Sequence, residues 1–138
     1  MLTERSAGCV LFRDTGTQRY YLLLHYTTGH WDFPKGNIEE GERDVDTVVR
    51  EVEEETGIAD IEFIPGFMEV IKYFYRRSGQ LVDKQVVFYL ACTHTDRVTI
   101  SHEHIGFTWL AYEDALAKLT YENSRRLFTK ARTLLEKT

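Results

Sequence analysis

Residues 36–58 combine a dense run of acidic side chains with a helical pattern of valines. The run holds nine acidic residues against two basic ones, Arg43 and Arg50; the acidic residues are Glu39, Glu40, Glu42, Asp44, Asp46, Glu51, Glu53, Glu54 and Glu55. Val45, Val48, Val49 and Val52 recur at i, i+3, i+4 and i+7, which predicts a helix over residues 44–56 with one apolar stripe. We expect Asp44 to be its N-cap and Gly57 to end it.

Three glutamates of this helix fall on one side of it. At about 100° per residue, Glu51, Glu54 and Glu55 lie together, off the valine stripe, whereas Glu53 lies on the other flank. Like charges three or four residues apart destabilise a helix, so this grouping favours a bound cation. Oxygen ligands suit a hard ion such as Mg²⁺, with Mn²⁺ as the alternative, and Mg²⁺ commonly bridges carboxylates and phosphates. A solvated acidic face without a cation is the competing interpretation.

The rest of the chain predicts a mixed sheet with helices on its faces. Segments rich in β-branched and aromatic residues predict strands at residues 6–12, 20–26, 61–64, 67–75, 85–93 and 106–110. Further helices are expected at residues 112–119 and 122–135, and a loop at residues 29–41. Residues 76–80 are expected to form a turn. The fold class is therefore α/β in the α+β sense, and 138 residues suit one domain over residues 1–138.

Composition excludes several classes of protein. The net charge of −5 argues against a stable nucleic-acid partner, which would call for a basic surface. The longest apolar stretch, residues 86–92, is far too short to span a membrane, and the N-terminal residues lack the pattern of a secretory signal. Cys9 and Cys92 lie in apolar runs and are expected to be buried free thiols, which makes the cytoplasm the expected compartment.

The spacing of the acidic segment resembles a known family. Gly36, five residues, Glu42, seven residues and then Arg50-Glu51-Val52-Glu53-Glu54-Glu55-Thr56-Gly57-Ile58 match every fixed position of the Nudix box. The resemblance implies the Nudix fold, a mixed sheet between helices, with the box at residues 36–58 forming a loop, a helix and a loop. It also implies metal-dependent hydrolysis of a nucleoside diphosphate linked to another group.

Motifs outside the box resemble the diadenosine tetraphosphate hydrolases of animal type. These motifs are residues 31–36 (WDFPKG), 66–67 (GF), 101–104 (SHEH) and 109–110 (WL). The resemblance implies hydrolysis of diadenosine tetraphosphate to ATP and AMP. Two features depart from it: Asp32-Phe33 stands where a Thr-Pro-like pair is expected, and the turn from Arg13 to Arg19 is compact. The first departure bears on how the substrate is positioned.

The resemblance assigns roles to the residues of the box. The implied metal site consists of Gly36, through its carbonyl, together with Glu51, Glu54, Glu55 and Glu103. Arg50 is expected to orient a box glutamate through charge-assisted hydrogen bonds. In the implied mechanism Mg²⁺ lowers the pKa of the attacking water, and which of Glu51, Glu54 or Glu103 accepts its proton stays open. Glu42 is expected to support the loop, and Glu53 to be ordinary helix surface.

A second group of residues is expected to bind the substrate, namely Lys35, Tyr73, Tyr75, Tyr121, His30 and His102. Lys35 would contact phosphate charge. Tyr73 and Tyr75 are two apart on an expected strand and so share a face with Ile71. By the resemblance, Tyr73 and Tyr121 form the two sides of an adenine clamp; partly buried core tyrosines are the competing interpretation.

The triplet His102-Glu103-His104 has its own prediction. In an extended segment the two histidines would point the same way and Glu103 the opposite way. Two histidines without further soft ligands are too few for zinc, so we expect them to contact substrate or to cap backbone groups.

Two other functions remain open from the sequence. One is an enzyme that removes pyrophosphate from RNA 5′ ends or acts broadly on nucleoside triphosphates. RNA would call for a basic groove, and the paired basic residues are confined to Arg76-Arg77 and Arg125-Arg126. The other is a nucleotide-sensing module without turnover, against which stands the complete set of box carboxylates.

Overall fold

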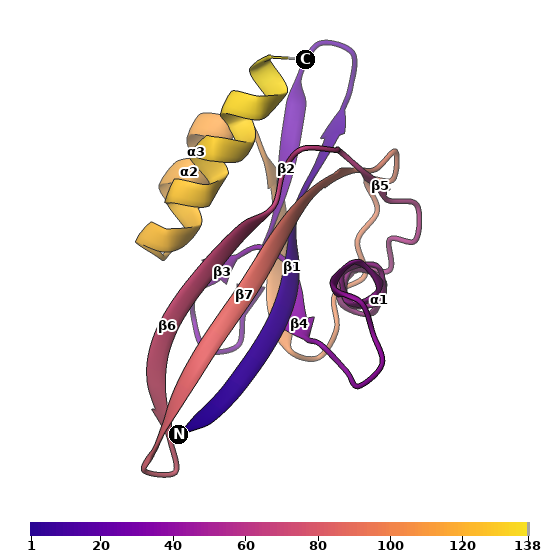
Figure 1. Cartoon of the computed structure of the whole chain (residues 1–138). Coiled ribbons are helices and arrows are strands. Elements are labelled where there is room, and N and C mark those ends of the chain that lie inside the picture. Colours follow the sequence, from indigo (N-terminus) through magenta and orange to yellow (C-terminus); the bar gives the residue numbers. More distant parts are fainter. Residues whose placement is uncertain (138) are drawn as a thin grey trace.

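A long parallel pair of strands runs through the centre of the structure (Figure 1). The computed structural model describes residues 1–137. Strand β1 (Leu2–Asp14) pairs with β7 (Gln80–Cys92) in register from Leu2 opposite Val82 to Phe12 opposite Cys92. Both strands contain nearly continuous apolar runs, which is typical of strands covered on both faces.

Within residues 1–137, six further strands complete one mixed sheet of eight strands. Strand β1 pairs with β2 (Arg19–Tyr26) only near its C-terminal end and with β4 (Lys35–Asn37) in its middle, at residues 6–8. Strand β2 also pairs with β3 (Trp31–Asp32) and β8 (His104–Leu110). Strands β5 (Glu62–Phe63) and β6 (Glu69–Arg77) both pair with β7. The segment between β2 and α1 therefore inserts where β2 diverges from β1.

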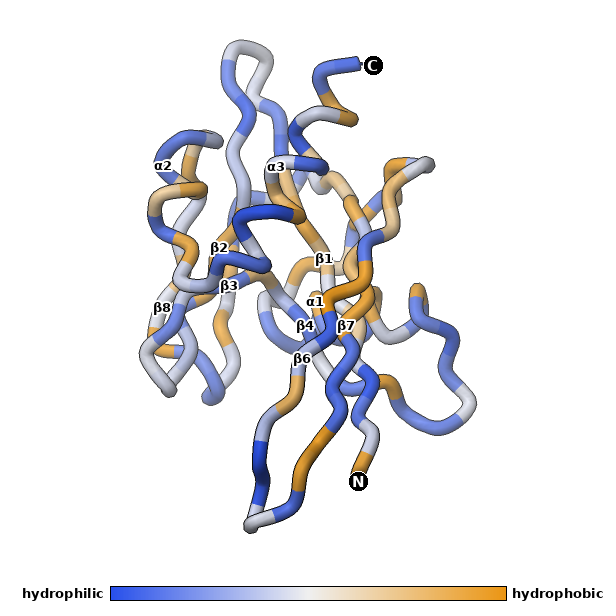
Figure 2. Tube along the Cα trace, turned by 60° about the vertical axis from the view of Figure 1, so that its left-hand side comes forward, coloured by the Kyte–Doolittle hydropathy of each residue, from blue (hydrophilic) through white to orange (hydrophobic). Residues whose placement is uncertain are grey.

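Helices cover both faces of the sheet. Helix α1 (Asp44–Thr56) lies on one face, and α2 (Tyr112–Lys118) and α3 (Glu122–Glu136) lie on the other (Figure 1). One core cluster joins α3 to the sheet around Phe88 and Phe128, and a second joins α1 to it around Val48 and Val52. Hydrophobic stretches lie in the middle of the molecule, where α1, β1 and β7 meet (Figure 2). This arrangement confirms the predicted mixed sheet between helices.

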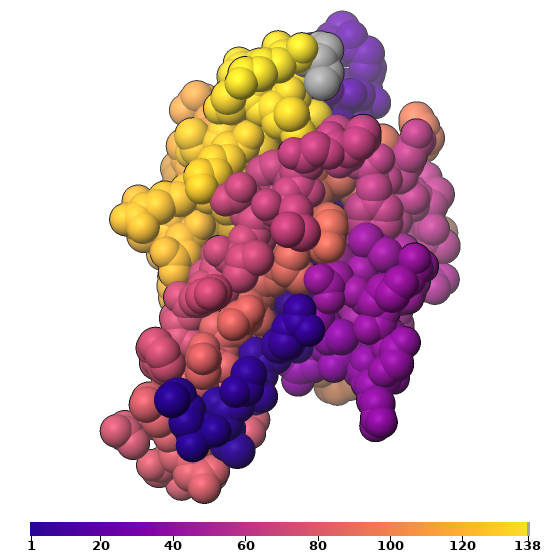
Figure 3. Space-filling model, in the orientation of Figure 1, coloured from indigo at the N-terminus to yellow at the C-terminus, as the bar shows by residue number. Residues whose placement is uncertain are grey.

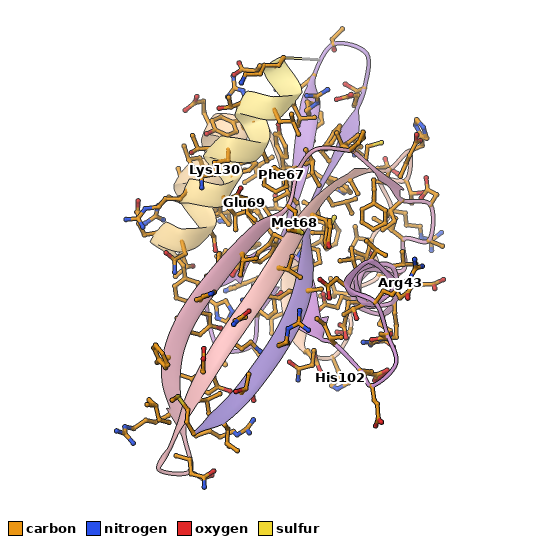
Figure 4. All side chains as sticks on the ribbon, viewed as in Figure 1. Arg43, Phe67, Met68, Glu69, His102 and Lys130 are labelled. Atoms are coloured by element: carbon orange, nitrogen blue, oxygen red, sulfur yellow. The ribbon has the colours of Figure 1, made fainter. Side chains whose placement is uncertain are left out.

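Side-chain ion pairs connect the layers at the surface. Lys130 of α3 and Glu69 of β6 are 2.8 Å apart from Nζ to Oε1 (Figure 4). On the other face, Arg5 of β1 lies 3.8 Å from Asp44 at the start of α1. The N-terminal half of β1 and the segment leading into α1 are accordingly side by side on the molecular surface (Figure 3).

The acidic helix has the predicted bounds but two corrected details. Its N-cap is Arg43 and not Asp44, because Asp46 reaches back to accept the Arg43 backbone N–H at 3.1 Å. Gly57 ends the helix as predicted, in the left-handed region with φ 78°, and donates its N–H to the carbonyl of Glu53. The predicted valine stripe is wrong at Val49, which is 42% exposed. The packed face is rotated towards Glu55, which is 3% exposed and so lies within that face instead of off it.

Several other boundaries differ from the prediction. The central strands are longer than predicted, and the expected loop at residues 29–41 contains the short strands β3 and β4. The expected turn at residues 76–80 is confined to Ser78 and Gly79, because its other residues continue β6 and β7. Cys9 is buried as expected, whereas Cys92, at the end of β7, is partly exposed; both thiols are free. Within residues 1–137 no helix is both long and apolar enough to cross a membrane.

Candidate active site

A polar cleft of about 740 Å³ opens between α1, β4 and the turn that precedes β8. All of the residues predicted for metal binding and catalysis line it: Gly36, Arg50, Glu51, Glu54, Glu55 and Glu103. Of the predicted substrate-binding residues, Lys35, Tyr73 and His102 line it as well.

The guanidinium group of Arg50 donates hydrogen bonds to the carboxylates of three glutamates. Its Nε and Nη2 donate to the two carboxylate oxygens of Glu42 at 2.7 and 3.0 Å. Its Nη1 donates to Glu51 at 2.8 Å and to Glu54 at 3.1 Å. These hydrogen bonds, above all those to Glu42, raise the pKa of Arg50 further above its ordinary value. Arg50 thus orients three box glutamates at once.

Glu42 supports the loop, as predicted. Besides Arg50, it accepts the backbone N–H of Glu39 at 2.9 Å and the hydroxyl of Thr47 at 2.8 Å. The hydrogen bonds from Arg50 are the largest cause that lowers the pKa of Glu42 to about 2. The loop before α1 is therefore fixed to the helix through one ionised carboxylate.

Glu55 is the most deeply placed carboxylate of the cleft. One of its oxygens accepts the backbone N–H of Lys35 at 3.0 Å. Burial, and then the charge of Glu51, raise the pKa of Glu55 to about 9. Burial also raises the pKa of Glu51. Both pKa values are raised mainly because burial disfavours the charged form of each carboxyl group.

The predicted alternation of the His-Glu-His triplet is wrong. Residues 102 and 103 form a turn, so the period of an extended strand does not apply. His104 is 4% exposed and packs edge-on against Tyr26, with its Nε2 at 3.6 Å from Glu55. His102 instead lies exposed at the cleft. Burial lowers the pKa of His104.

The donor set fits a hard divalent cation, although the side chains are not preassembled around one. Within residues 1–137, no three His, Cys, Asp or Glu side chains are grouped as a ready-made metal site. Arg50 instead pairs with Glu51 and Glu54. A Cβ atom at Gly36 would lie 2.0 Å from Cδ of Glu51, so only glycine leaves room for this carboxylate. The available donors are carboxylate oxygens and a backbone carbonyl, and Mg²⁺-like ions prefer such oxygen ligands.

A second, more apolar cleft of about 580 Å³ adjoins the first. Tyr26, Lys35 and Tyr73 line both clefts. His30 and Tyr121 line the second, and their rings are 5.2 Å apart. The side chains of Tyr73 and Tyr121 are 37% and 47% exposed, so neither is a core residue. The adenine clamp stays a prediction. Both rings are accessible to a ligand in the second cleft.

Tyr75 is the one predicted site residue that lines neither cleft. Its hydroxyl donates to Glu4 of β1. Tyr73 and Tyr75 do neighbour each other, with ring centroids 6.3 Å apart, but only the ring of Tyr73 reaches the clefts.

Sequence reasoning missed several residues of the two clefts. Tyr26 lines both and donates its hydroxyl to the carbonyl of Phe33 at 2.7 Å. Lys84 reaches the polar cleft because β7 lies beside β1, a pairing that no local motif announces. Asn37 follows Gly36 directly and accepts the Ser6 hydroxyl at 2.8 Å, so its position next to the box was the available signal.

Comparison with known proteins agrees with this geometry. The family model described as NUDIX domain matches residues 2–131. The chain is 34% identical over 124 residues to the asymmetrical bis(5′-nucleosyl)-tetraphosphatase of Mus musculus, covering 80% of this chain and 81% of that protein. It is 29% identical over 103 residues to an RNA pyrophosphohydrolase of Helicobacter pylori, covering 66% and 64%. The structure resembles a binary complex of a C. elegans Ap4A hydrolase with a TM-score of 0.86 and 29% identity, covering 98% of this chain and 99% of that one.

Proposed function

The chain belongs to the Nudix family and is a pyrophosphohydrolase, and from this premise we propose that its substrate is diadenosine tetraphosphate, cleaved to ATP and AMP. The observation that carries the proposal is the junction of the two clefts. A cleft lined by carboxylates continues into a cleft lined by aromatic rings, and Tyr26, Lys35 and Tyr73 line both. A nucleotide with a long phosphate chain needs such a pair of adjoining sites.

The family uses a divalent metal ion, and we propose Mg²⁺, with Mn²⁺ as the alternative. Gly36, Glu51, Glu54, Glu55 and Glu103 are the residues that would hold it. When bound, the ion would lower the pKa of the attacking water and neutralise charge on the phosphate oxygens.

The other residues of the clefts bind and orient the substrate, and some of them accept protons. Lys35 lines both clefts, with its ammonium group 3.3 Å from Asp32, and we propose that it contacts a phosphate. Tyr73 and Tyr121 hold the adenine, while His30 and His102 border the substrate. Glu54 and Glu103 both line the polar cleft and are exposed, so either carboxylate can accept the proton of the attacking water.

Removal of pyrophosphate from RNA ends is the second candidate, supported by the likeness to the RNA pyrophosphohydrolase. The charges of the surface favour it less. Arg77 pairs with Glu4, and Arg125 pairs with Glu122 and the carbonyl of Leu119. A net charge of −5 adds to this, so we propose a small nucleotide substrate and no stable nucleic-acid partner.

We further propose that residues 1–138 form one domain that acts in the cytoplasm. The box at residues 36–58 contacts segments from β1 to the turn before β8, so the site draws on most of the chain. The free thiols of Cys9 and Cys92 suit a reducing compartment.

The variant E51Q tests the role of the polar cleft. Its amide cannot supply the charge that a divalent cation needs, so turnover of diadenosine tetraphosphate should fall by roughly tenfold or more. E40Q, in the exposed part of the loop, is the matched control and should keep wild-type turnover. Wild-type turnover by a folded E51Q protein, checked by circular dichroism, would contradict the proposal.

A further inference from the structure

Three hydrogen bonds connect β3 with the start of α3 at the wall of the aromatic cleft. Ser124 donates its hydroxyl to Asp32 at 2.9 Å. Thr120 accepts the backbone N–H of Trp31 on its hydroxyl at 2.8 Å, and its own N–H donates to the Trp31 carbonyl at 3.2 Å. We call these three bonds the β3–α3 contact. Asp32 and Ser124 are 1% and 3% exposed, so the bond between them is shielded from water.

Asp32 connects the two parts of the substrate site. The oxygen that accepts from Ser124 also accepts the N–H of Phe33 at 2.8 Å. Its other oxygen accepts from the ammonium group of Lys35 at 3.3 Å. Lys35 is at the junction of the clefts. Tyr121 lies in the sequence between Thr120 and Ser124, the two residues that make the contact with β3. The β3–α3 contact therefore fixes the ring of Tyr121 relative to the phosphate side of the site.

The β3–α3 contact lies at the first turn of α3, whereas the apolar residues that pack the helix on the sheet come later. Within the described part of α3, Ser124 is the buried residue of the first turn, and the apolar anchors Leu127, Phe128, Ala131 and Leu135 come later. Tyr121 is the N-cap residue, and its side chain makes no capping hydrogen bond. Loss of the contact should therefore loosen the first turn and the ring of Tyr121 while the rest of α3 stays on the sheet.

We propose that Ser124 and Thr120 are positioning residues for the nucleobase, which act by holding Tyr121 at a set distance from Lys35. The inference rests on the proposed function, since it takes the aromatic cleft to be the base site. A ligand with a base should depend on the contact. A ligand that consists of phosphates alone should not, because it occupies only the carboxylate cleft and the Lys35 ammonium group, whose bond to Asp32 is kept.

Two probes distinguish these cases. One is a diadenosine tetraphosphate analogue whose bridging oxygens are replaced by methylene groups, and the other is inorganic tripolyphosphate, each titrated calorimetrically in Mg²⁺. For S124A we expect the dissociation constant of the analogue to rise about fivefold or more and that of tripolyphosphate to stay within about twofold. T133A removes a hydroxyl of α3 that bonds only within the helix, and it should change neither constant.

A folding defect, failure of the inference and failure of the proposed function give different results. If S124A does not fold, T120V replaces it, because Thr120 is exposed and Val has nearly the same shape; T120S, which keeps the hydroxyl, should then bind the analogue like the wild type. Equal weakening of both probes, or no weakening of either by a folded variant, would overturn the inference. Failure of the proposed function would show separately, as absence of turnover by the wild-type protein.

Discussion

At the scale of residues, neighbouring glutamates of one helix have different surroundings. Glu54 lines the polar cleft and accepts a hydrogen bond from Arg50, whereas Glu53 is exposed and lines no part of the cleft. The spacing of the carboxylates predicted this difference, because the two side chains project about 100° apart. Spacing did not predict that Glu55 is buried, because the direction of the packed face was taken from Val49, which is exposed.

We expect E54Q to lose at least about tenfold in turnover of diadenosine tetraphosphate, and E53Q to stay within about threefold of the wild type. Of these two glutamates, only Glu54 lines the cleft, so only Glu54 can act on a ligand there as a metal ligand or a proton acceptor. Steady-state kinetics at saturating Mg²⁺ measure both variants. Equal losses would show that the assigned face of α1 is wrong.

The tyrosines give a second residue-scale prediction. Y73A and Y121A should each raise KM for diadenosine tetraphosphate about tenfold, since stacking on an aromatic ring contributes about 1–3 kcal/mol per base. Because both rings are partly exposed, the melting temperature should change little. Y73F and Y121F should behave like the wild type, because stacking needs the ring and not the hydroxyl. A loss of several degrees of melting temperature with an unchanged KM would point to a structural role instead.

At the scale of elements, the acidic helix was the best predicted part of the fold and the segment before it the least. Helix α1 has a strong 3.6-residue pattern and a clear final glycine, so its bounds follow from local sequence. Strands β3 and β4 have two and three residues and form only because β2 and β1 supply their partners. The turn at residues 102–103 likewise has no local signal, and it decides where His104 lies.

Burial of Glu55 within α1 predicts a pH-dependent stability of the metal-free protein. Its pKa is raised from 4.5 to about 9, so the folded state binds more protons than the unfolded state between these values. The stability contributed by the protonated carboxyl is present below about pH 4.5 and is lost as the pH rises through about 9. E55Q, which has no such proton, should match the wild type near pH 4 and melt at a higher temperature at pH 8.

Thermal melts in a chelator at both pH values measure this effect. Added Mg²⁺ at pH 8 should raise the melting temperature of the wild type more than that of E55Q, because metal binding to the ionised carboxylate is linked to folding. A lower melting temperature for metal-free E55Q at pH 8 would contradict the assigned protonation of Glu55.

At the scale of the whole molecule, the site lies where distant segments meet. The box supplies carboxylates from α1, β6 supplies Tyr73, the start of α3 supplies Tyr121, and the turn before β8 supplies Glu103. Motifs predicted the members of this set but not their grouping into two adjoining clefts. Strand pairing determines that grouping, and it also explains why Tyr75, predicted from its spacing to Tyr73, instead bonds to Glu4.

In the proposed reaction, these two clefts together cleave diadenosine tetraphosphate asymmetrically with a divalent ion. The most direct test is a chromatogram of the products after incubation of the wild-type protein with this substrate, with Mg²⁺ and with excess chelator. We expect equal amounts of ATP and AMP with Mg²⁺ and intact substrate in the chelator. Formation of ADP alone, or intact substrate in the presence of Mg²⁺, would contradict the proposed reaction.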